Sequence, residues 1–193
     1  DFPGDTSCKA AGDASEACVT SEGVQLITSA MTMGDTTGAT NDVTPMGCSS
    51  AHTAGDRTFR IDVPALTSLA MNLTANFDTA SVLFNATCAG VPLQCSDPLN
   101  MNLVNLAAGT YYYVVDGYSN GVGPFTIQMD GKIANNASCE SPLVAGGALS
   151  CGNGYACKGA VGAKTCAPAL CSDGIDNDSP PDGKADYPAD PGC

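Results

Sequence analysis

The sequence predicts an all-β protein: an antiparallel β-sandwich, jelly-roll-like, followed by a small disulfide-rich appendage. Short runs in which apolar and polar residues alternate predict strands that are buried on one face. Turn formers separate these runs, since the chain contains 22 Gly and 12 Pro. Long segments with apolar residues at the helical period are nearly absent. Strands at intervals of roughly 8–15 residues are typical of sandwiches and related antiparallel folds.

The strand pattern recurs along the middle of the chain, and in most runs every second residue is apolar. The expected strands are Val24–Ala30, Thr58–Val63, Ser68–Leu73, Ser81–Phe84, Asn100–Leu106, Thr110–Asp116 and Pro124–Met129. Because successive side chains of a strand point to opposite faces, the alternation also predicts the core. Its expected inward residues are Phe59, Ile61, Val63, Leu69, Met71, Leu73, Tyr111, Tyr113, Val115, Phe125, Ile127 and Met129.

Composition divides the chain into three regions. Residues 1–22 form an N-terminal extension with two cysteines and little apolar sequence. Residues 23–133 contain all the expected strands and form the sandwich. In residues 134–193 the alternation fades and cysteines become frequent, so we expect disulfides to supply order that a small core cannot.

Eleven cysteines in 193 residues predict a disulfide-bonded protein from an oxidising compartment. No Cys-x-x-Cys spacing, the usual mark of zinc sites, occurs in the sequence. Cys88 and Cys95 bracket a short loop and are expected to pair, as are Cys171 and Cys193. An interleaved pattern, first to third and second to fourth, is one possible arrangement of Cys139, Cys151, Cys157 and Cys166. The odd cysteine is expected among Cys8, Cys18 and Cys48.

The C-terminal segment between Cys171 and Cys193 contains six aspartates, broken up by Gly and Pro. Such a stretch has almost no apolar surface to bury, and its like charges repel. Ca²⁺ takes oxygen ligands from carboxylates and carbonyls and can order a segment of this kind. The expected ligands are Asp173, Asp176, Asp178, Asp182, Asp186 and Asp190. The alternative is a solvated acidic tail.

The net charge of −13 makes cations the natural partners of this chain. Nucleic acid and anionic membrane surfaces are expected to be repelled, because both are negatively charged. No stretch approaches the ~20 apolar residues that span a bilayer. No signal peptide is visible, so we expect a secreted, mature form whose leader has been removed.

Several segments of the middle region resemble the bacterial pre-peptidase C-terminal domain. They are Gly34–Asp42, Asp56–Pro64, Phe77–Asp78, Cys88 with Cys95, Gly109–Gly117 and Gly123–Ile127. The resemblance covers roughly residues 20–131. It implies a small β-sandwich with a binding or structural role rather than a catalytic one.

The same resemblance implies calcium near the edge of the sandwich, with Asp35, Asn41, Asp42 and Asp56 as candidate ligands. The alternative is that these residues cap turns without a metal. Asp97 and Asp116 are interpreted as turn formers. The Cys-rich C-terminal region resembles modules of large secreted proteins from myxobacteria-like organisms, although Ser179–Pro181 lengthens its acidic loop.

No catalytic constellation is recognisable in the sequence. His52 is the single histidine and lies among small and polar residues, so a Ser/His/Asp triad would depend on it alone. A glycosidase needs one carboxylic acid in an aromatic-lined cleft, for which three Glu and no Trp are poor material. We therefore expect no enzymatic activity.

These observations predict a non-enzymatic extracellular calcium-binding structural protein. Its subunits are expected to assemble into a surface fibre or layer through calcium and strand-edge contacts, without nucleic acid and without insertion into a membrane. The alternative is an accessory binding or adhesion module of a secreted bacterial protein, with a glycan or protein ligand. In that case the Tyr111–Tyr113 cluster is a candidate contact face. A hydrolase of unrecognised type is the weakest hypothesis.

Overall fold

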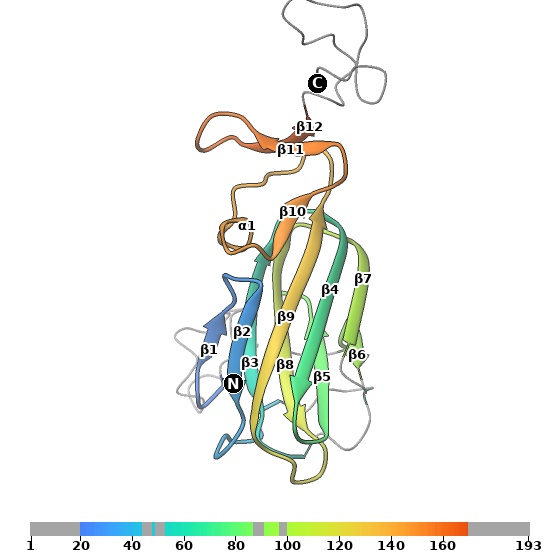
Figure 1. Ribbon diagram of the computed structural model, residues 1–193. Helices are drawn as coiled ribbons and strands as arrows, with labels where there is room; N and C mark the ends of the chain where they lie inside the picture. Colours follow the sequence, from blue (N-terminus) through green and yellow to red (C-terminus); the bar gives the residue numbers. More distant parts are fainter. Residues whose placement is uncertain (1–19, 44–47, 49–52, 87–90, 97–99, 170–193) are drawn as a thin grey trace, which may run out of the picture.

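The computed structural model describes residues 20–43, 48, 53–86, 91–96 and 100–169. Figure 1 shows two β-sheets packed face to face, with a small cap at one end built by the last part of the described chain. The β-sandwich predicted from the alternation is confirmed. Most strand pairs are antiparallel, and the parallel pairs lie at sheet edges.

The first sheet has five strands. In spatial order they are β1 (Val24–Leu26), β3 (Arg57–Val63), β8 (Gly109–Gly117), β5 (Thr79–Phe84) and β6 (Gln94–Ser96). β1 runs parallel to β3, whereas the other neighbours are antiparallel. In the β3–β8 pair Arg57 lies opposite Val115. The same register places the acidic residues that adjoin them, Asp56 and Asp116, side by side.

The second sheet is organised around one strand that has three neighbours. Its strands are β2 (Met31–Asp35), β4 (Leu66–Ala75), β7 (Asn100–Leu106), β9 (Pro124–Ile133) and β10 (Leu149–Cys151). β4 pairs with one side of β9, and β7 pairs with the far side of β4. The other side of β9 is divided: β2 pairs antiparallel with its first half, and β10 pairs parallel with its last three residues.

The core lies between the two sheets and is formed by the residues that the alternation predicted to point inward. All twelve of these side chains are buried and belong to one apolar cluster. Phe59 of one sheet meets Phe125 of the other edge to face, with ring centroids 5.8 Å apart. The sequence therefore predicted the inward faces of β3, β4, β8 and β9 correctly.

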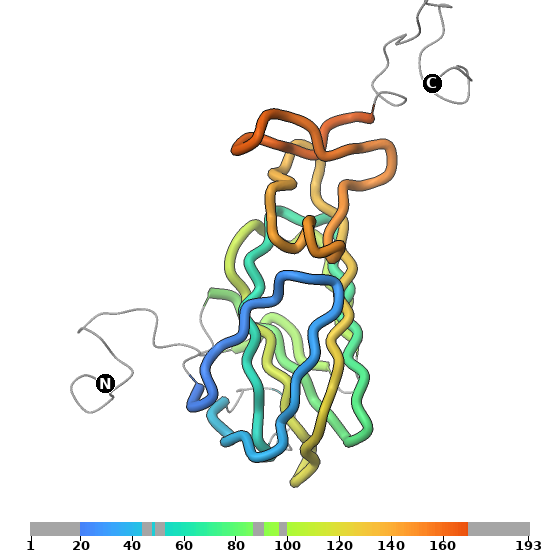
Figure 2. The backbone as a smooth tube through the Cα atoms, turned by 60° about the vertical axis from the view of Figure 1, so that its left-hand side comes forward, coloured from blue at the N-terminus to red at the C-terminus, as the bar shows by residue number. Residues whose placement is uncertain are grey.

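The first expected strand differs from the structure in a way that opens one side of the sandwich. Val24–Ala30 was expected to be one strand, but β1 ends at Leu26 and the chain crosses to the other sheet. On the way Ile27 N–H donates to Arg60 O at 2.9 Å, and Ala30 N–H donates to Gly146 O at 2.9 Å. The chain then forms β2, which was not among the expected strands. Figure 2 shows β1 and β2, in blue, as two arms of this bend.

Described residues of the loop between β2 and β3 cover the outer face of the first sheet and add a second, smaller core. Val43 of this loop packs on Val82, Phe84 and Val114, and Cys48 joins the same cluster. The loop is held by a disulfide from Cys48 to Cys95.

The expected disulfide from Cys88 to Cys95 is therefore wrong. The short sequence separation favoured that pair, but the packing of the loop onto the sheet brings Cys48 to β6 instead. Cys48 is also excluded as the odd cysteine. The three described disulfides leave Cys8, Cys18, Cys88, Cys171 and Cys193. Because this number is odd, at least one of them either bonds outside these 193 residues or stays a thiol.

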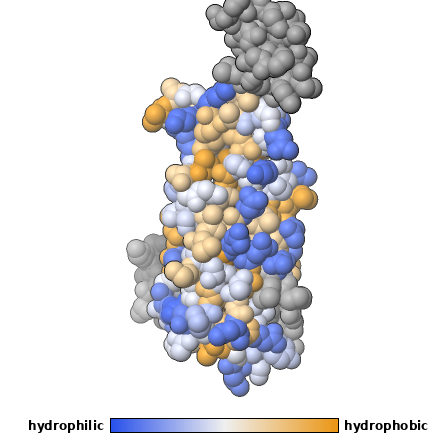
Figure 3. All heavy atoms as spheres, viewed as in Figure 1, coloured by the Kyte–Doolittle hydropathy of each residue, from blue (hydrophilic) through white to orange (hydrophobic). Residues whose placement is uncertain are grey.

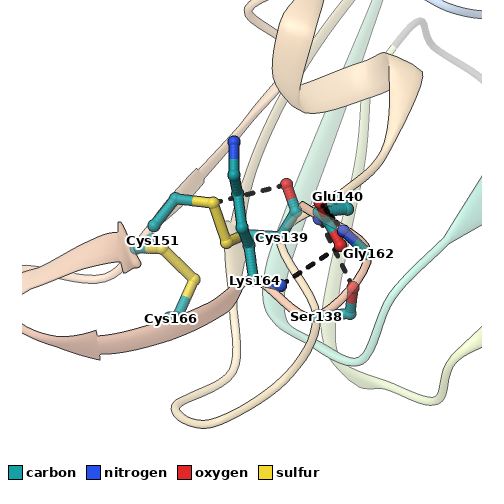
Figure 4. Close-up of a disulfide and its surroundings, with 8 residues drawn as sticks. Ser138, Cys139, Glu140, Cys151, Gly162, Lys164 and Cys166 are labelled. Atoms are coloured by element: carbon teal, nitrogen blue, oxygen red, sulfur yellow. Dashed lines mark hydrogen bonds between the residues drawn. A yellow bond between two sulfur atoms is a disulfide. The ribbon is translucent and has the colours of Figure 1, made fainter. Parts of the chain in front are cut away.

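The cap consists of β10, the short helix α1 (Pro142–Ala145) and a hairpin of β11 (Tyr155–Lys158) and β12 (Thr165–Pro168). Ser141 caps α1 with its side chain, and Pro142 starts the helix. Disulfides join Cys139 to Cys157 and Cys151 to Cys166, which confirms the interleaved pattern. Figure 4 shows them close together. Among the described residues no helix has the length and hydrophobicity needed to cross a membrane.

Substitution of Gly34 by Ala tests the packing of β2 on the core. A Cβ at this position would overlap the ring of Phe125, so we expect Gly34→Ala to lower the free energy of unfolding by about 1–3 kcal/mol. Urea titration of the purified protein measures this change. Gly152→Ala is the matched control, because nothing lies within 4 Å of the point that its Cβ would occupy. Equal stability of the two variants would contradict the packing described for Gly34.

Candidate functional site

Two aspartates lie side by side beneath the loop that covers the first sheet. Asp56 immediately precedes β3, and Asp116 is the penultimate residue of β8. The register that pairs Arg57 with Val115, continued by one residue, places Asp56 opposite Asp116. Both residues are buried, with 0% of Asp56 and 1% of Asp116 exposed. Like charges directly opposite each other in a sheet are unfavourable, so this pair needs compensation.

Asp56 fixes the covering loop with only one of its two carboxylate oxygens. Its Oδ2 accepts hydrogen bonds from the backbone N–H groups of Asp42 and Val43, both at 2.8 Å. Its own N–H donates to Thr40 O at 3.0 Å. Oδ1 is buried as well and accepts no hydrogen bond. A buried carboxylate oxygen without a partner is costly, and it marks the position where a cation or a proton would be stabilised.

The electrostatic environment of Asp56 favours its neutral form. Burial is the largest effect and raises the pKa of Asp56 to about 6, while the N–H groups of Val43 and Asp42 oppose the rise. The charges of Asp116 and Asp42 raise the pKa further. Near neutral pH the carboxyl group of Asp56 is therefore ionised in an environment that disfavours its charged form.

Asp116 was interpreted as a turn former, and the structure corrects this interpretation. It lies within β8, on the outward side of the strand that also presents Tyr112 and Val114. Its Oδ1 accepts the N–H of Gly117 at 2.6 Å.

A second pair of carboxylates lies at the outer end of the same loop. Thr40 Oγ1 is 2.9 Å from Glu22 Oε1 and 2.9 Å from Asp42 Oδ2. Its single hydrogen can serve only one of them. Asp42 also accepts Ser21 N–H at 2.7 Å. Desolvation acts to raise the pKa of Asp42, but the hydrogen bonds from Ser21 and Thr40 outweigh it and lower the pKa.

Glu22 was not among the residues expected from the sequence. Its Oε1 accepts Thr40 N–H at 2.9 Å, whereas its Oε2 is buried and has no hydrogen-bond partner. Glu22, Asp42, Asp56 and Asp116 together form what we call the acidic cluster. It offers only oxygen ligands, the type that hard divalent cations prefer.

The other two expected ligands in this region are placed differently. Asp35 Oδ1 accepts Thr37 N–H at 2.7 Å, which is a turn contact, and hydrogen bonding by Thr37 lowers the pKa of Asp35. Asp35 O accepts a hydrogen bond from Arg57 Nε at 2.7 Å. Asn41 is exposed beside Asp42. Asp173, Asp176, Asp178, Asp182, Asp186, Asp190, Asp97, His52 and the expected Cys171–Cys193 disulfide lie outside the described residues.

Within the described ranges, one group of three metal-type side chains has its ligand atoms within 4.8 Å of one another. It consists of Cys139, Cys151 and Cys166, and all three sulfurs are already in disulfides. No three carboxylates of the acidic cluster have their oxygens this close together, so one ion would take at most two of them. A cation bound there would complete its shell with carbonyl oxygens and water.

No family model matches the sequence, and neither does any curated protein. Among solved structures, the chain is similar to the pre-peptidase C-terminal domain of a collagenase from Bacillus anthracis. The identity is 14%, the TM-score 0.42, and the match covers 55% of this chain and 94% of that domain. It is also similar to a periplasmic inhibitor of g-type lysozyme from Aeromonas hydrophila, at 6% identity and a TM-score of 0.37 over 55% and 97% of the two chains. With TM-scores below 0.5, neither likeness carries an argument about the site.

The pKa of Asp56 predicts a pH dependence of stability in the presence of a chelator. A folded pKa of about 6 lies above the unfolded value of about 3.9, so the folded state holds this proton more tightly. The contribution of this proton to the free energy of unfolding is fully present below pH ~4 and is lost as the pH rises through ~6. The free energy of unfolding should therefore fall by about 3 kcal/mol over this range. Urea unfolding between pH 4 and 7 measures it.

Asp56→Asn removes this titration and keeps an oxygen for the two N–H groups, so the difference from the unmodified protein should change with pH. Asp35→Asn is the control. The pKa of Asp35 is lowered in the folded protein, so its contribution to stability is present above the unfolded pKa and is lost only at more acidic pH. Parallel curves for the unmodified protein and Asp56→Asn across this range would contradict the prediction.

Proposed function

We propose that this protein is a non-enzymatic extracellular structural protein that binds calcium at the acidic cluster and assembles with copies of itself. The observation that carries the calcium proposal is Asp56 Oδ1, a buried carboxylate oxygen without a hydrogen bond, next to a second buried aspartate. A divalent cation would neutralise both carboxylates and supply the missing partner.

The ligand set supports calcium over other common metals. All four side chains of the acidic cluster are carboxylates, with no imidazole or thiolate among them. Oxygen-only sites suit Ca²⁺ and Mg²⁺, and Ca²⁺ tolerates the irregular geometry and the mixed carbonyl and water ligands that a loop provides. The role we propose is structural: Asp56 holds the amides of residues 42 and 43, and the bound ion would keep this carboxylate charged and in place.

A second calcium site is proposed on sequence grounds alone, in the Asp-rich segment between Cys171 and Cys193. Three disulfides in the described part of the chain support an oxidising compartment, and with the composition they support secretion. The cysteine that finds no partner in the chain is consistent with a bond to another subunit.

A second candidate function, an accessory binding module, is supported by a groove between β1 and β2. Its volume is about 350 Å³, and its lining includes Glu22, Gln25, Asp35, Arg57 and Phe59. The polar side chains of Glu22, Gln25, Asp35 and Arg57 could hydrogen-bond a sugar or a peptide. A glycan array probed with the labelled protein tests this candidate, and loss of a hit in Arg57→Ala would place the ligand in the groove.

Calcium binding is tested by thermal unfolding in calcium and in chelator. A site filled at 100 times its dissociation constant adds about 2.7 kcal/mol, so we expect a clear rise in Tm with calcium. Asp56→Asn should lose the part of this rise that is due to the acidic cluster, while any contribution of the C-terminal segment remains. Asp130→Asn, on an exposed face, is the control and should respond like the unmodified protein. An identical response of all three proteins would refute the site.

A further inference from the structure

The second sheet has two open edges on opposite sides of the molecule. Among the described strands, β2 pairs only with β9, and β7 pairs only with β4. Figure 1 shows β1 and β2 on one side of the sandwich and β6 and β7 on the other. Open edges present unpaired backbone groups and are natural sites for the addition of another strand.

The hydrogen-bond alternation shows which backbone groups face the open edges. Met129 N–H donates to Ala30 O at 2.8 Å, and Thr36 N–H donates to Gly123 O at 3.0 Å. These bonds bracket the β2–β9 ladder, so the alternation of an antiparallel pair turns the N–H and C=O of Met33 away from β9. Continued across β9 and β4, the same alternation leaves those of Asn102 and Val104 at the free edge of β7.

Side chains of the protein already satisfy carbonyls at the ends of these edges. Arg57 Nε donates to Asp35 O at 2.7 Å, and Ser29 Oγ donates to Met31 O at 2.7 Å. On the other edge Ser96 Oγ donates to Asn100 O at 3.0 Å. The backbone groups of Met33, Asn102 and Val104, in the central part of each edge, remain for an incoming strand.

The two edges also match in direction. Successive neighbours from β2 through β9 and β4 to β7 are antiparallel, so β2 and β7 run in opposite directions. Two copies in the same orientation would therefore bring β7 of one beside β2 of the next as an antiparallel pair. The residues with free backbone groups point outward on both strands, so the outer faces of the two sheets would continue into each other.

Charge and hydrophobicity favour a second copy as the occupant. β7 contains no charged residue and β2 contains only Asp35, although the chain carries −13, so copies meet least repulsion here. Natural edge strands are usually protected by Lys or Pro, and neither strand contains one. Of the ten large exposed apolar residues in the described part of the chain, seven lie in or directly beside these elements: Val24, Leu26, Met31 and Met33 in β1 and β2, and Val91, Leu93 and Val104 before β6 and in β7. The other three, Tyr118, Val122 and Val161, lie elsewhere. In Figure 3 hydrophobic and hydrophilic residues are mixed on the face between them.

We propose that β7 of one copy adds to β2 of the next copy, so that the second sheet runs through successive subunits. Because the two edges differ, the contact is heterologous and forms an open-ended fibre rather than a closed dimer. This inference rests on the self-assembly part of the proposed function and names its joint.

The test uses two edge-blocking variants of the full chain. Met33→Pro and Val104→Pro each remove an N–H that points to solvent and spare the ladders to β9 and β4. Each variant keeps one working edge. We expect the unmodified protein to form species larger than a dimer in sedimentation velocity, and each variant alone to be monomeric. An equimolar mixture should form one-to-one dimers, since the intact β7 of Met33→Pro can pair with the intact β2 of Val104→Pro.

Met33→Ala and Val104→Ala are the matched controls, because they retain both backbone donors and should still assemble. If either proline variant is unfolded by circular dichroism, Met33→Lys and Val104→Lys replace the pair under the same mixing scheme. Dimers of Val104→Pro alone would indicate a symmetric β2–β2 contact and overturn the proposal. So would an unmodified protein that stays monomeric at high concentration with calcium.

The two proposals fail separately. If calcium raises the Tm and Asp56→Asn loses that rise, but the mixture stays monomeric, the calcium site stands and the joint is wrong. If the mixture forms dimers while calcium has no effect on the Tm, the joint stands and the calcium site is wrong.

Discussion

The described structure depends on the hydrogen bonding of β9 to three partners. β4 occupies one side of this strand, while β2 and β10 share the other. One strand therefore ties the first part of the sandwich and the cap to the same core. Leu143 and Leu149 of the cap belong to the same apolar cluster as Ile127 and Met129 of β9. Separating the cap would expose this cluster and break the β9–β10 pairing, so the cap shares the core of the sandwich.

The loop over the first sheet combines three kinds of interaction with different dependences on the environment. The Cys48–Cys95 disulfide depends on redox conditions, and the packing of Val43 depends on buried area. The hydrogen bonds that Asp56 accepts from the backbone N–H groups of residues 42 and 43 depend on the charge of its carboxylate. The charge of Asp56 is thus the part of this anchor that solution conditions can change most readily. The exposed carboxylate of Asp35, which accepts the N–H of Thr37, has no comparable effect on the loop.

Local sequence was sufficient where one face of a strand is buried and the other is not. Phe59, Ile61 and Val63 could be assigned to the core because a period of two leaves only one consistent choice of face. β2 could not be found in this way. Its sequence, Met-Thr-Met-Gly-Asp, is too short to show a clear period, and it is a strand because β9 offers it a hydrogen-bonding edge and Phe125 fills the space above Gly34.

The candidate site was predictable in part, from the resemblance to the pre-peptidase C-terminal domain. Asp42 and Asp56 were expected near one another, and the hydrogen bond between Asp42 N–H and Asp56 Oδ2 brings them together. Asp116 is 60 residues farther along the chain, so only the pairing of β3 with β8 reveals it as a neighbour. The partner of Cys95 posed a similar problem, since it is determined by how a covering loop packs and not by distance along the chain.

The crossed connectivity of the cap has a consequence for its resistance to proteolysis. The loop closed by Cys139 and Cys157 overlaps the loop closed by Cys151 and Cys166. A cut at any single peptide bond between residues 139 and 166 therefore leaves the two pieces joined by at least one sulfur bridge. Two consecutive bridges would protect less, because a cut between the two loops severs the chain. A single cut between residues 139 and 166 thus does not release the segment that follows the cap.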